Sequence, residues 1–223
     1  MPHGHTHDDH HPTHAHGHAH DQGLAGFLRY ASMLPRMWKS DVSEAVVALV
    51  NPKPGERVIE IGAGMGAAMV PAARTGAHVT AVDPTPYMRR ILRVRSLAHG
   101  GPWRISVCDG AAEHLPIADA SADAVFTVNT MHHWSDLDRA LFEIRRVLRP
   151  GGRVVLVDED FENPAHPSHE QFARRRARHG HSFDEVDPAK MAVLLRSLAF
   201  TSATGSLELV AGMLAKVVRA TRA

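Results

Sequence analysis

Two patterns of hydrophobic residues alternate along this chain. Short apolar runs rich in β-branched residues are followed by longer segments in which apolar residues recur every three or four positions. The first pattern predicts buried strands, and the second predicts amphipathic helices. Strands are expected at 57–61, 78–82, 103–108, 124–129 and 154–157, followed by a hairpin within 201–218. Helices between successive strands predict an α/β fold with a mostly parallel sheet.

The first expected strand runs into three alternate glycines, Gly62, Gly64 and Gly66. Glycines at this spacing indicate a turn with positive φ or a close approach of backbone to another group. Helix-forming residues follow from Ala67. A strand, a glycine loop and a helix N-terminus can together hold a ligand against backbone N–H groups. A glycine-rich turn without a ligand is the alternative interpretation.

Acidic residues follow the next two expected strands. Asp83 ends the second strand and Asp109 ends the third. The carboxyl ends of parallel strands meet at one sheet edge, so both acids are expected near the glycine loop. A carboxylate at the position of Asp83 can accept both hydroxyls of a ribose. The alternative role for Asp83 is a helix cap before Pro84.

Composition narrows the class of protein. At 223 residues the chain is long enough for one α/β domain and short for two. A formal net charge of +1 gives no basic footprint for nucleic acid. The single cysteine, Cys108, excludes an internal disulfide or a cysteine-cluster metal site. No apolar stretch or signal pattern predicts membrane insertion or export, so we expect a cytoplasmic monomer or homodimer.

Residues 1–23 form a histidine-rich tail of low complexity, expected to be disordered, ahead of a domain at 24–223. Neutral imidazoles bind Zn, Ni, Cu and Co, so divalent metal binding is one interpretation. A solubilising tail is the other. The candidate metal ligands are His3, His5, His7, His10, His11, His14, His16, His18 and His20.

Three motifs occur in a characteristic order. They are Glu60-x-Gly62-x-Gly64-x-Gly66, Thr130-Met131-His132-His133-Trp134 and Arg149-Pro150-Gly151-Gly152. With the two strand-end acids, this set resembles the Rossmann-like (class I) methyltransferases that depend on S-adenosylmethionine (SAM). Within that class it is most similar to the type 11, quinone-biosynthesis-like group that acts on small molecules. The resemblance implies a seven-stranded, mostly parallel sheet with helices on both faces and one antiparallel C-terminal strand.

The same resemblance implies SAM as cofactor and a small-molecule acceptor methylated on O, N or C. His132 or His133 would be the general base, unless either is only a structural histidine. The glutamate-led glycine motif disfavours a nicotinamide cofactor. The alternative is a metal-handling or regulatory protein that binds SAM but has no strong methyltransferase activity. The implied cofactor-binding residues are Glu60, Gly62, Ala63, Gly64, Gly66, Asp83, Pro84, Met88, Asp109, Gly110, Ala111, Asn129 and Met131.

Two further segments carry weaker predictions. The arginines of the expected helix over 87–99, including Arg89 and Arg95, are interpreted as a solvated face. Residues 163–183 look like an insertion after the fifth strand. An insertion there would lie over the ligand-binding edge of the sheet, so it is a candidate lid.

Overall fold

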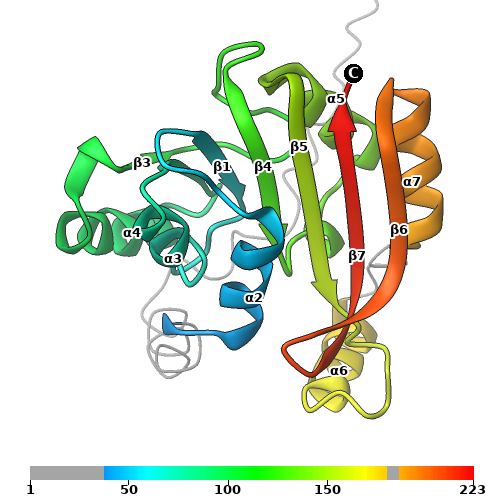
Figure 1. Cartoon of the computed structure of the whole chain (residues 1–223). Coiled ribbons are helices and arrows are strands. Elements are labelled where there is room, and N and C mark those ends of the chain that lie inside the picture. The colour runs from blue at the N-terminus through cyan, green and yellow to red at the C-terminus, as the bar shows by residue number, and fades with distance from the viewer. Residues whose placement is uncertain (1–37, 180–185) are drawn as a thin grey trace, which may run out of the picture. The chain divides into compact units, whose positions relative to one another are not determined.

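A computed structural model describes residues 38–179 and 186–223, and its centre is one seven-stranded sheet (Figure 1). The strand order is β3-β2-β1-β4-β5-β7-β6. Only β7 runs against its neighbours β5 and β6, while the other strands share one direction. The predicted fold, with one antiparallel C-terminal strand, is therefore confirmed. The strands are β1 (Arg57–Ile61), β2 (His78–Val82), β3 (Ile105–Cys108), β4 (Ala122–Val128), β5 (Leu148–Glu159), β6 (Phe200–Val210) and β7 (Met213–Arg222).

Helices cover both faces of the sheet because each buried strand alternates its apolar side chains between the two faces. One face packs against α2 (Asp41–Val50), α3 (Met69–Arg74) and α4 (Pro86–Ala98). The other packs against α5 (Leu137–Val147) and α7 (Pro188–Ser197). The helix α6 (His169–His179) follows β5 and lies at the end of the sheet toward which β5 points (Figure 1).

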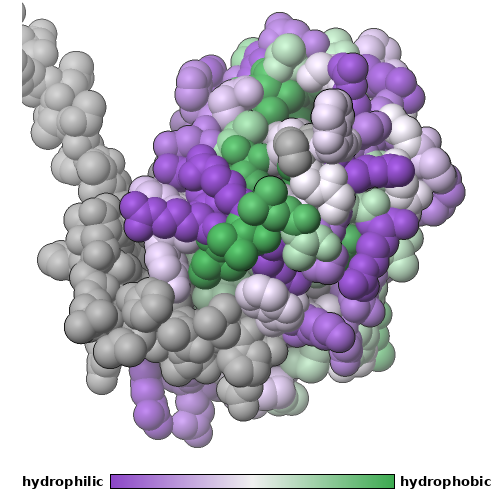
Figure 2. Space-filling view, turned by 90° about the vertical axis from the view of Figure 1, so that its left-hand side faces the viewer, coloured by the Kyte–Doolittle hydropathy of each residue, from purple (hydrophilic) through white to green (hydrophobic). Residues whose placement is uncertain are grey.

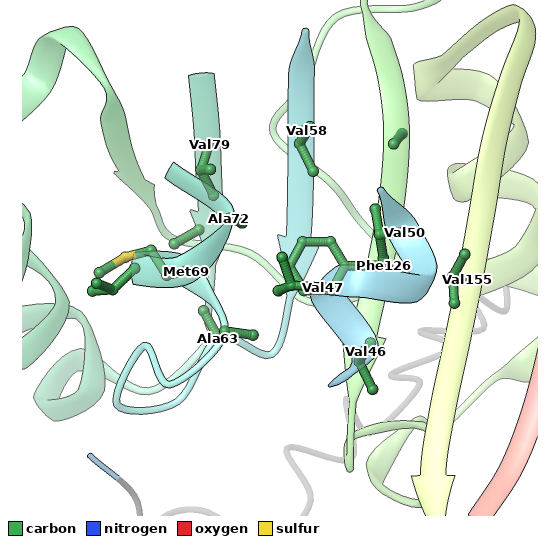
Figure 3. Packing of buried hydrophobic residues seen from close by; sticks show 14 of the residues in the cluster. Val46, Val47, Val50, Val58, Ala63, Met69, Ala72, Val79, Phe126 and Val155 are labelled. Carbon is green, nitrogen blue, oxygen red and sulfur yellow. The ribbon is translucent and has the colours of Figure 1, made fainter. Parts of the chain in front are cut away.

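The first of these cores shows how the alternation works. Val58 of β1 and Phe126 of β4 belong to the core under α2 and α3, whereas Ile59 and Val125 belong to the opposite core. Figure 3 shows Phe126 and Val58 on the side of the sheet covered by α2, near Val47. This alternation also directs the side chain of Glu60 to the same face as Val58.

Several strand boundaries differ from the sequence prediction, and the starts of β3 and β5 have a clear structural cause. A 3-10 turn, η2 (Gly101–Trp103), precedes β3, so that strand begins at Ile105 instead of 103. The strand β5 begins at Leu148, well before the expected 154, because Leu148 already pairs with Ala122. The register then shifts before Arg153 pairs with Ala124, and the intervening Pro150-Gly151-Gly152 segment supplies the irregularity.

The prediction that the α4 arginines form a solvated face is wrong for two of them. Arg89 and Arg95 are buried, at 8% and 4% exposure, while Arg90 and Arg93 are exposed. Apolar residues take part of the outer surface instead, and Figure 2 shows a hydrophobic area on the side of the molecule that carries α4. The large exposed hydrophobic residues of α4 and η2 are Val94, Leu97 and Trp103.

Within the described part of the chain, every helix is too short or too polar to cross a membrane.

Candidate active site

The glycine loop follows β1, and all three of its glycines have positive φ, at 69°, 52° and 78°. A β-carbon added to Gly62 would lie 2.2 Å from Cγ2 of Thr130. One added to Gly66 would lie 2.9 Å from Cδ2 of Leu92. Gly64 differs, because no atom of the other described residues lies closer than 4.0 Å to its added β-carbon. Gly62 and Gly66 therefore allow close packing, and Gly64 leaves open space beside bare backbone.

Asp83 holds this loop in place from the end of β2. Its Oδ2 accepts the Gly64 N–H at 2.8 Å, and its Oδ1 accepts the Thr85 N–H at 2.8 Å. Burial raises the pKa of this carboxyl, although the hydrogen bonds from Thr85 and Gly64 and the charge of Arg89 oppose that shift. The N-cap of α4 is Thr85, so the bond from the Thr85 N–H to Asp83 closes a turn before the helix and does not cap it. Each carboxylate oxygen has a second acceptor position, so these hydrogen bonds leave Asp83 able to accept from a ribose.

Arg89 forms hydrogen bonds to residues at the ends of both β2 and β3, which the sequence prediction missed. Its Nη1 donates to the carbonyl oxygen of Asp83 at 2.9 Å, and its Nη2 contacts Oδ2 of Asp109 at 2.8 Å. The Asp109 side chain is 71% exposed, so it faces solvent at the sheet edge. Gly110 follows, and an added β-carbon there would lie 2.6 Å from Cδ of Pro116. The two acids are therefore brought together as the sequence predicted.

Glu60 is buried at 3% exposure, and its Oε2 has no hydrogen-bond partner among the described residues. Burial and the nearby charge of Asp83 raise its pKa to about 8, against an opposing effect of Arg95. Arg95 itself donates to the carbonyl oxygens of Met65 and Trp38, and its guanidinium lies 4.1 Å from the centre of the Trp38 ring. Glu60 therefore stays protonated near neutral pH.

Replacing Glu60 by glutamine is expected to weaken the pH dependence of stability. The folded carboxyl keeps its proton up to about pH 8, whereas the unfolded one titrates near 4.5. Between these values the folded state binds more protons, so stability falls as pH rises. At about 1.4 kcal/mol per pKa unit, the loss is on the order of a few kcal/mol. Thermal melts at about pH 5 and about pH 8 should show a smaller drop for the variant, and an equal drop would contradict this assignment.

The segment after β4 carries the other predicted site residues, Asn129, Met131, His132 and His133. Asn129 follows β4 with φ of 57° and exchanges two hydrogen bonds with Glu159, at 2.6 and 2.8 Å. The turn η3 (Met131–His133) comes next. Met131 is buried at 2% exposure in the core under α5, so it supports the turn from below. His132 is half-buried and His133 is exposed.

The two histidines lie among aromatic rings. The ring centre of His132 is 4.1 Å from that of His133, 5.7 Å from Phe161 and 5.9 Å from Phe172. Phe161 and Phe172 stack on each other at 5.2 Å. Phe161 follows β5 and Phe172 lies on α6, so the insertion after β5 contributes to this cluster. The sequence prediction placed the insertion at this edge but did not identify either phenylalanine.

His132 has a carboxylate partner that the sequence prediction left without a role. Its Nδ1 lies 2.8 Å from Oδ2 of Asp158, the buried acid near the end of β5. A second pair lies nearby, where Nε2 of His166 contacts Oε2 of Glu159 at 3.0 Å and Nδ1 of His166 accepts the Ser168 N–H. Neither acid follows a recognisable motif, and only the packing of β5 against β4 brings Asp158 under the turn.

The remaining predicted cofactor residues differ in their burial. Ala63 and Met88 are buried, while Pro84 is exposed and Ala111 is half-buried. The nine predicted metal ligands of the tail lie outside the described residues. Among the residues that the structure describes, no group of three or more His, Cys, Asp or Glu side chains could hold a metal ion.

The strand order and the helices on both faces of the sheet are those of the Rossmann-like methyltransferase fold. A family model described as "Methyltransferase domain" matches residues 59–156, from β1 to β5. Residues 59–156 are therefore similar to methyltransferase domains.

Curated relatives match the same region. A ubiquinone/menaquinone biosynthesis C-methyltransferase of Rubrivivax gelatinosus is 34% identical over 130 residues, which is 58% of this chain and 47% of the relative. A demethylmenaquinone methyltransferase of Streptomyces avermitilis is 35% identical over 129 residues, covering 58% of this chain and 51% of the relative. The chain thus spans about half the length of the curated relatives it matches.

Solved structures share the fold over a longer stretch. The phosphoethanolamine N-methyltransferase 2 of Haemonchus contortus, in complex with SAM, aligns with a TM-score of 0.72 at 16% identity, over 92% of this chain and 58% of that one. A SAM-dependent methyltransferase from Aquifex aeolicus aligns with a TM-score of 0.63 at 18% identity, over 86% of this chain and 93% of that one.

Proposed function

We propose that this protein transfers a methyl group from SAM to an O, N or C atom of a small-molecule acceptor. The observation that carries this proposal is the convergence of four strand ends at one edge of the sheet. They bring the glycine loop, Asp83, Asp109 and the turn with His132 together. The first three elements suit a nucleoside with a charged tail, and the fourth suits an acceptor beside it.

The proposed roles follow from what each group can bind. Gly64 offers open space beside backbone for the methionyl part of SAM. Asp83 accepts from the ribose hydroxyls through its remaining acceptor positions, and the exposed carboxylate of Asp109 accepts from the adenine amine. Methyl transfer neutralises the sulfonium, so alignment of the acceptor with the methyl group supplies much of the rate. The chemistry of the acceptor then depends on the surroundings of His132 and His133.

Names of the similar proteins support a small acceptor without fixing its reacting atom. Two relatives are named for quinone-biosynthesis methylation, one of them as a C-methyltransferase, and one structural neighbour is named as an N-methyltransferase. The segment after β5 is the proposed specificity element and lid, because Phe161 and the α6 residue Phe172 meet beside His132.

Calorimetry and label transfer test this function. The full chain should bind SAM and S-adenosylhomocysteine, and should bind NAD weakly or not at all. It should then move a labelled methyl group from SAM to the low-molecular-mass fraction of a cell extract. SAM binding without any transfer would favour the alternative of a SAM-binding regulatory or metal-handling protein. Tight NAD binding without SAM binding would contradict both.

Metal binding by the histidine-rich residues 1–23 is a separate proposal that rests on composition alone. Equilibrium dialysis with Zn²⁺, Ni²⁺, Cu²⁺ or Co²⁺ should show uptake by the full chain that is lost when residues 1–23 are removed. Binding should also weaken below neutral pH, because protons compete for imidazole. Equal uptake by both proteins would refute this proposal.

A further inference from the structure

Asp158 is a buried carboxylate whose hydrogen bonds converge on the turn that carries His132. Its Oδ1 accepts the backbone N–H groups of Thr130 and Met131, at 2.8 and 3.2 Å. Its Oδ2 accepts the backbone N–H of His132 at 3.0 Å and lies 2.8 Å from Nδ1 of the same residue. One side chain, itself 3% exposed, therefore fixes both the backbone and the imidazole of this turn.

These contacts determine which ring nitrogen of His132 carries the proton. The three backbone groups bonded to Asp158 are all N–H donors, so both of its oxygens act as hydrogen-bond acceptors. A charged carboxylate can only accept hydrogen bonds, so Nδ1 of His132 must donate. In the neutral ring, the lone pair that can take a proton is then on Nε2.

The turn that carries His132 packs on the glycine loop through Thr130 and on the aromatic cluster through the His132 ring. Thr130, two residues earlier, packs so closely on Gly62 that an added β-carbon would meet its Cγ2 at 2.2 Å. On the other side, the ring lies 5.7 Å from Phe161 and 5.9 Å from Phe172. The His132 side chain is 14% exposed.

We propose that Asp158 is a positioning residue that holds His132 as the Nδ1–H tautomer, so that Nε2 takes the proton from the methyl acceptor. This inference rests on the proposed function. A lone pair on the acceptor oxygen or nitrogen forms the bond to the methyl carbon, and the C–S bond breaks with its electron pair on sulfur. The acceptor proton moves to Nε2, and the resulting imidazolium lies beside the negative charge of Asp158.

Asp158→Asn tests this assignment, because an amide can keep the acceptor for Thr130 and Met131 but turns an NH₂ group toward Nδ1 of His132. That donor forces the proton onto Nε2, which can then no longer accept. We expect methyl transfer from labelled SAM to the low-molecular-mass extract fraction to fall by about 100-fold or more. SAM affinity by calorimetry should stay within about threefold, because Asp158 touches the turn and not the nucleoside edge.

Nitrogen-15 NMR of the histidines reports the tautomer directly and does not need an acceptor. The His132 signal is assigned by its loss in His132→Gln. It should show Nδ1–H in the native chain and Nε2–H in Asp158→Asn. An Nε2–H ring in the native chain would overturn the inference, even if Asp158→Asn failed to fold.

Glu56→Gln is the matched control. Glu56 is also a hydrogen-bonded carboxylate, held by Arg153 and the Lys53 N–H, but it precedes β1 at the opposite edge of the sheet. This variant should keep transfer near the native rate. Transfer within about threefold of native in Asp158→Asn, or an equal loss in both variants, would overturn the positioning role while leaving the proposed function intact. A native chain that binds SAM but transfers no label would instead contradict the proposed function, and the inference with it.

Discussion

Asp83→Ala is expected to weaken SAM binding by about 100-fold or more. The substitution removes the proposed acceptor for two ribose hydroxyls, and hydrogen bonds to a charged group contribute about 1.5–3 kcal/mol each. Each 1.4 kcal/mol is about tenfold in affinity. The variant also loses the 2.8 Å bond to the Gly64 N–H, which leaves the glycine loop less well ordered. Calorimetry with SAM and S-adenosylhomocysteine measures the effect.

Asp187→Ala controls for the general cost of losing an aspartate that accepts two backbone N–H groups. Asp187 also accepts two backbone N–H groups through one side chain, from Ala189 and Lys190, but it caps α7 beside β6, far along the sheet from the glycine loop. Removing such a cap costs about 1 kcal/mol of stability. SAM affinity should be unchanged in this variant. Near-native SAM binding by Asp83→Ala would refute the ribose role.

Gly62→Ala is expected to lower the free energy of unfolding by about 3 kcal/mol or more and to abolish tight SAM binding. Alanine at φ of 69° is strained, and its β-carbon would lie 2.2 Å from Cγ2 and 2.9 Å from Cβ of Thr130. Either the glycine loop or the turn leading to His132 must move, and both belong to the candidate site. Denaturant unfolding and SAM calorimetry measure the two effects.

Two companion variants separate strain from collision. Gly212→Ala, in the β6–β7 hairpin, has φ of 80°, and within residues 38–179 and 186–223 no atom lies within 4 Å of the new β-carbon, so it measures the φ cost alone. Gly62→Ala combined with Thr130→Ser removes the colliding Cγ2 and should recover the steric part of the loss. If Gly62→Ala costs no more than Gly212→Ala, the close contact with Thr130 has no energetic importance.

The fold could be predicted because its signals are local. Strand segments such as Val58–Ile61 and Val154–Val157, and the amphipathic helices between them, are recognised from the hydrophobic pattern of a few consecutive residues. The glycine loop and Asp83 could be predicted for the same reason, since a parallel sheet brings strand ends to one edge. Their hydrogen bond, between Gly64 N–H and Asp83 Oδ2, agrees with that placement.

The arginines of α4 show where such reasoning fails. A charged side chain on a helix is usually solvated, so Arg89 and Arg95 gave no sign of burial in the sequence. Their burial depends on acceptors that come from elsewhere in the chain. Arg89 bonds to Asp83 and Asp109, and Arg95 to the carbonyl oxygens of Met65 and Trp38. Helical periodicity carries no information about those partners.

Sequence alone determined the sheet, the strand-end acids and the loop of Gly62, Gly64 and Gly66, because each depends on residue type and short-range order. The tertiary structure decided how these parts are held. Asp158 lies 26 residues beyond His132, and only the parallel pairing of β4 with β5 brings its carboxylate to 2.8 Å from Nδ1. The raised pKa of Glu60 likewise comes from burial, which is a property of the packed core and not of the motif. Contacts between distant residues set the protonation of the site, and a local pattern cannot encode them.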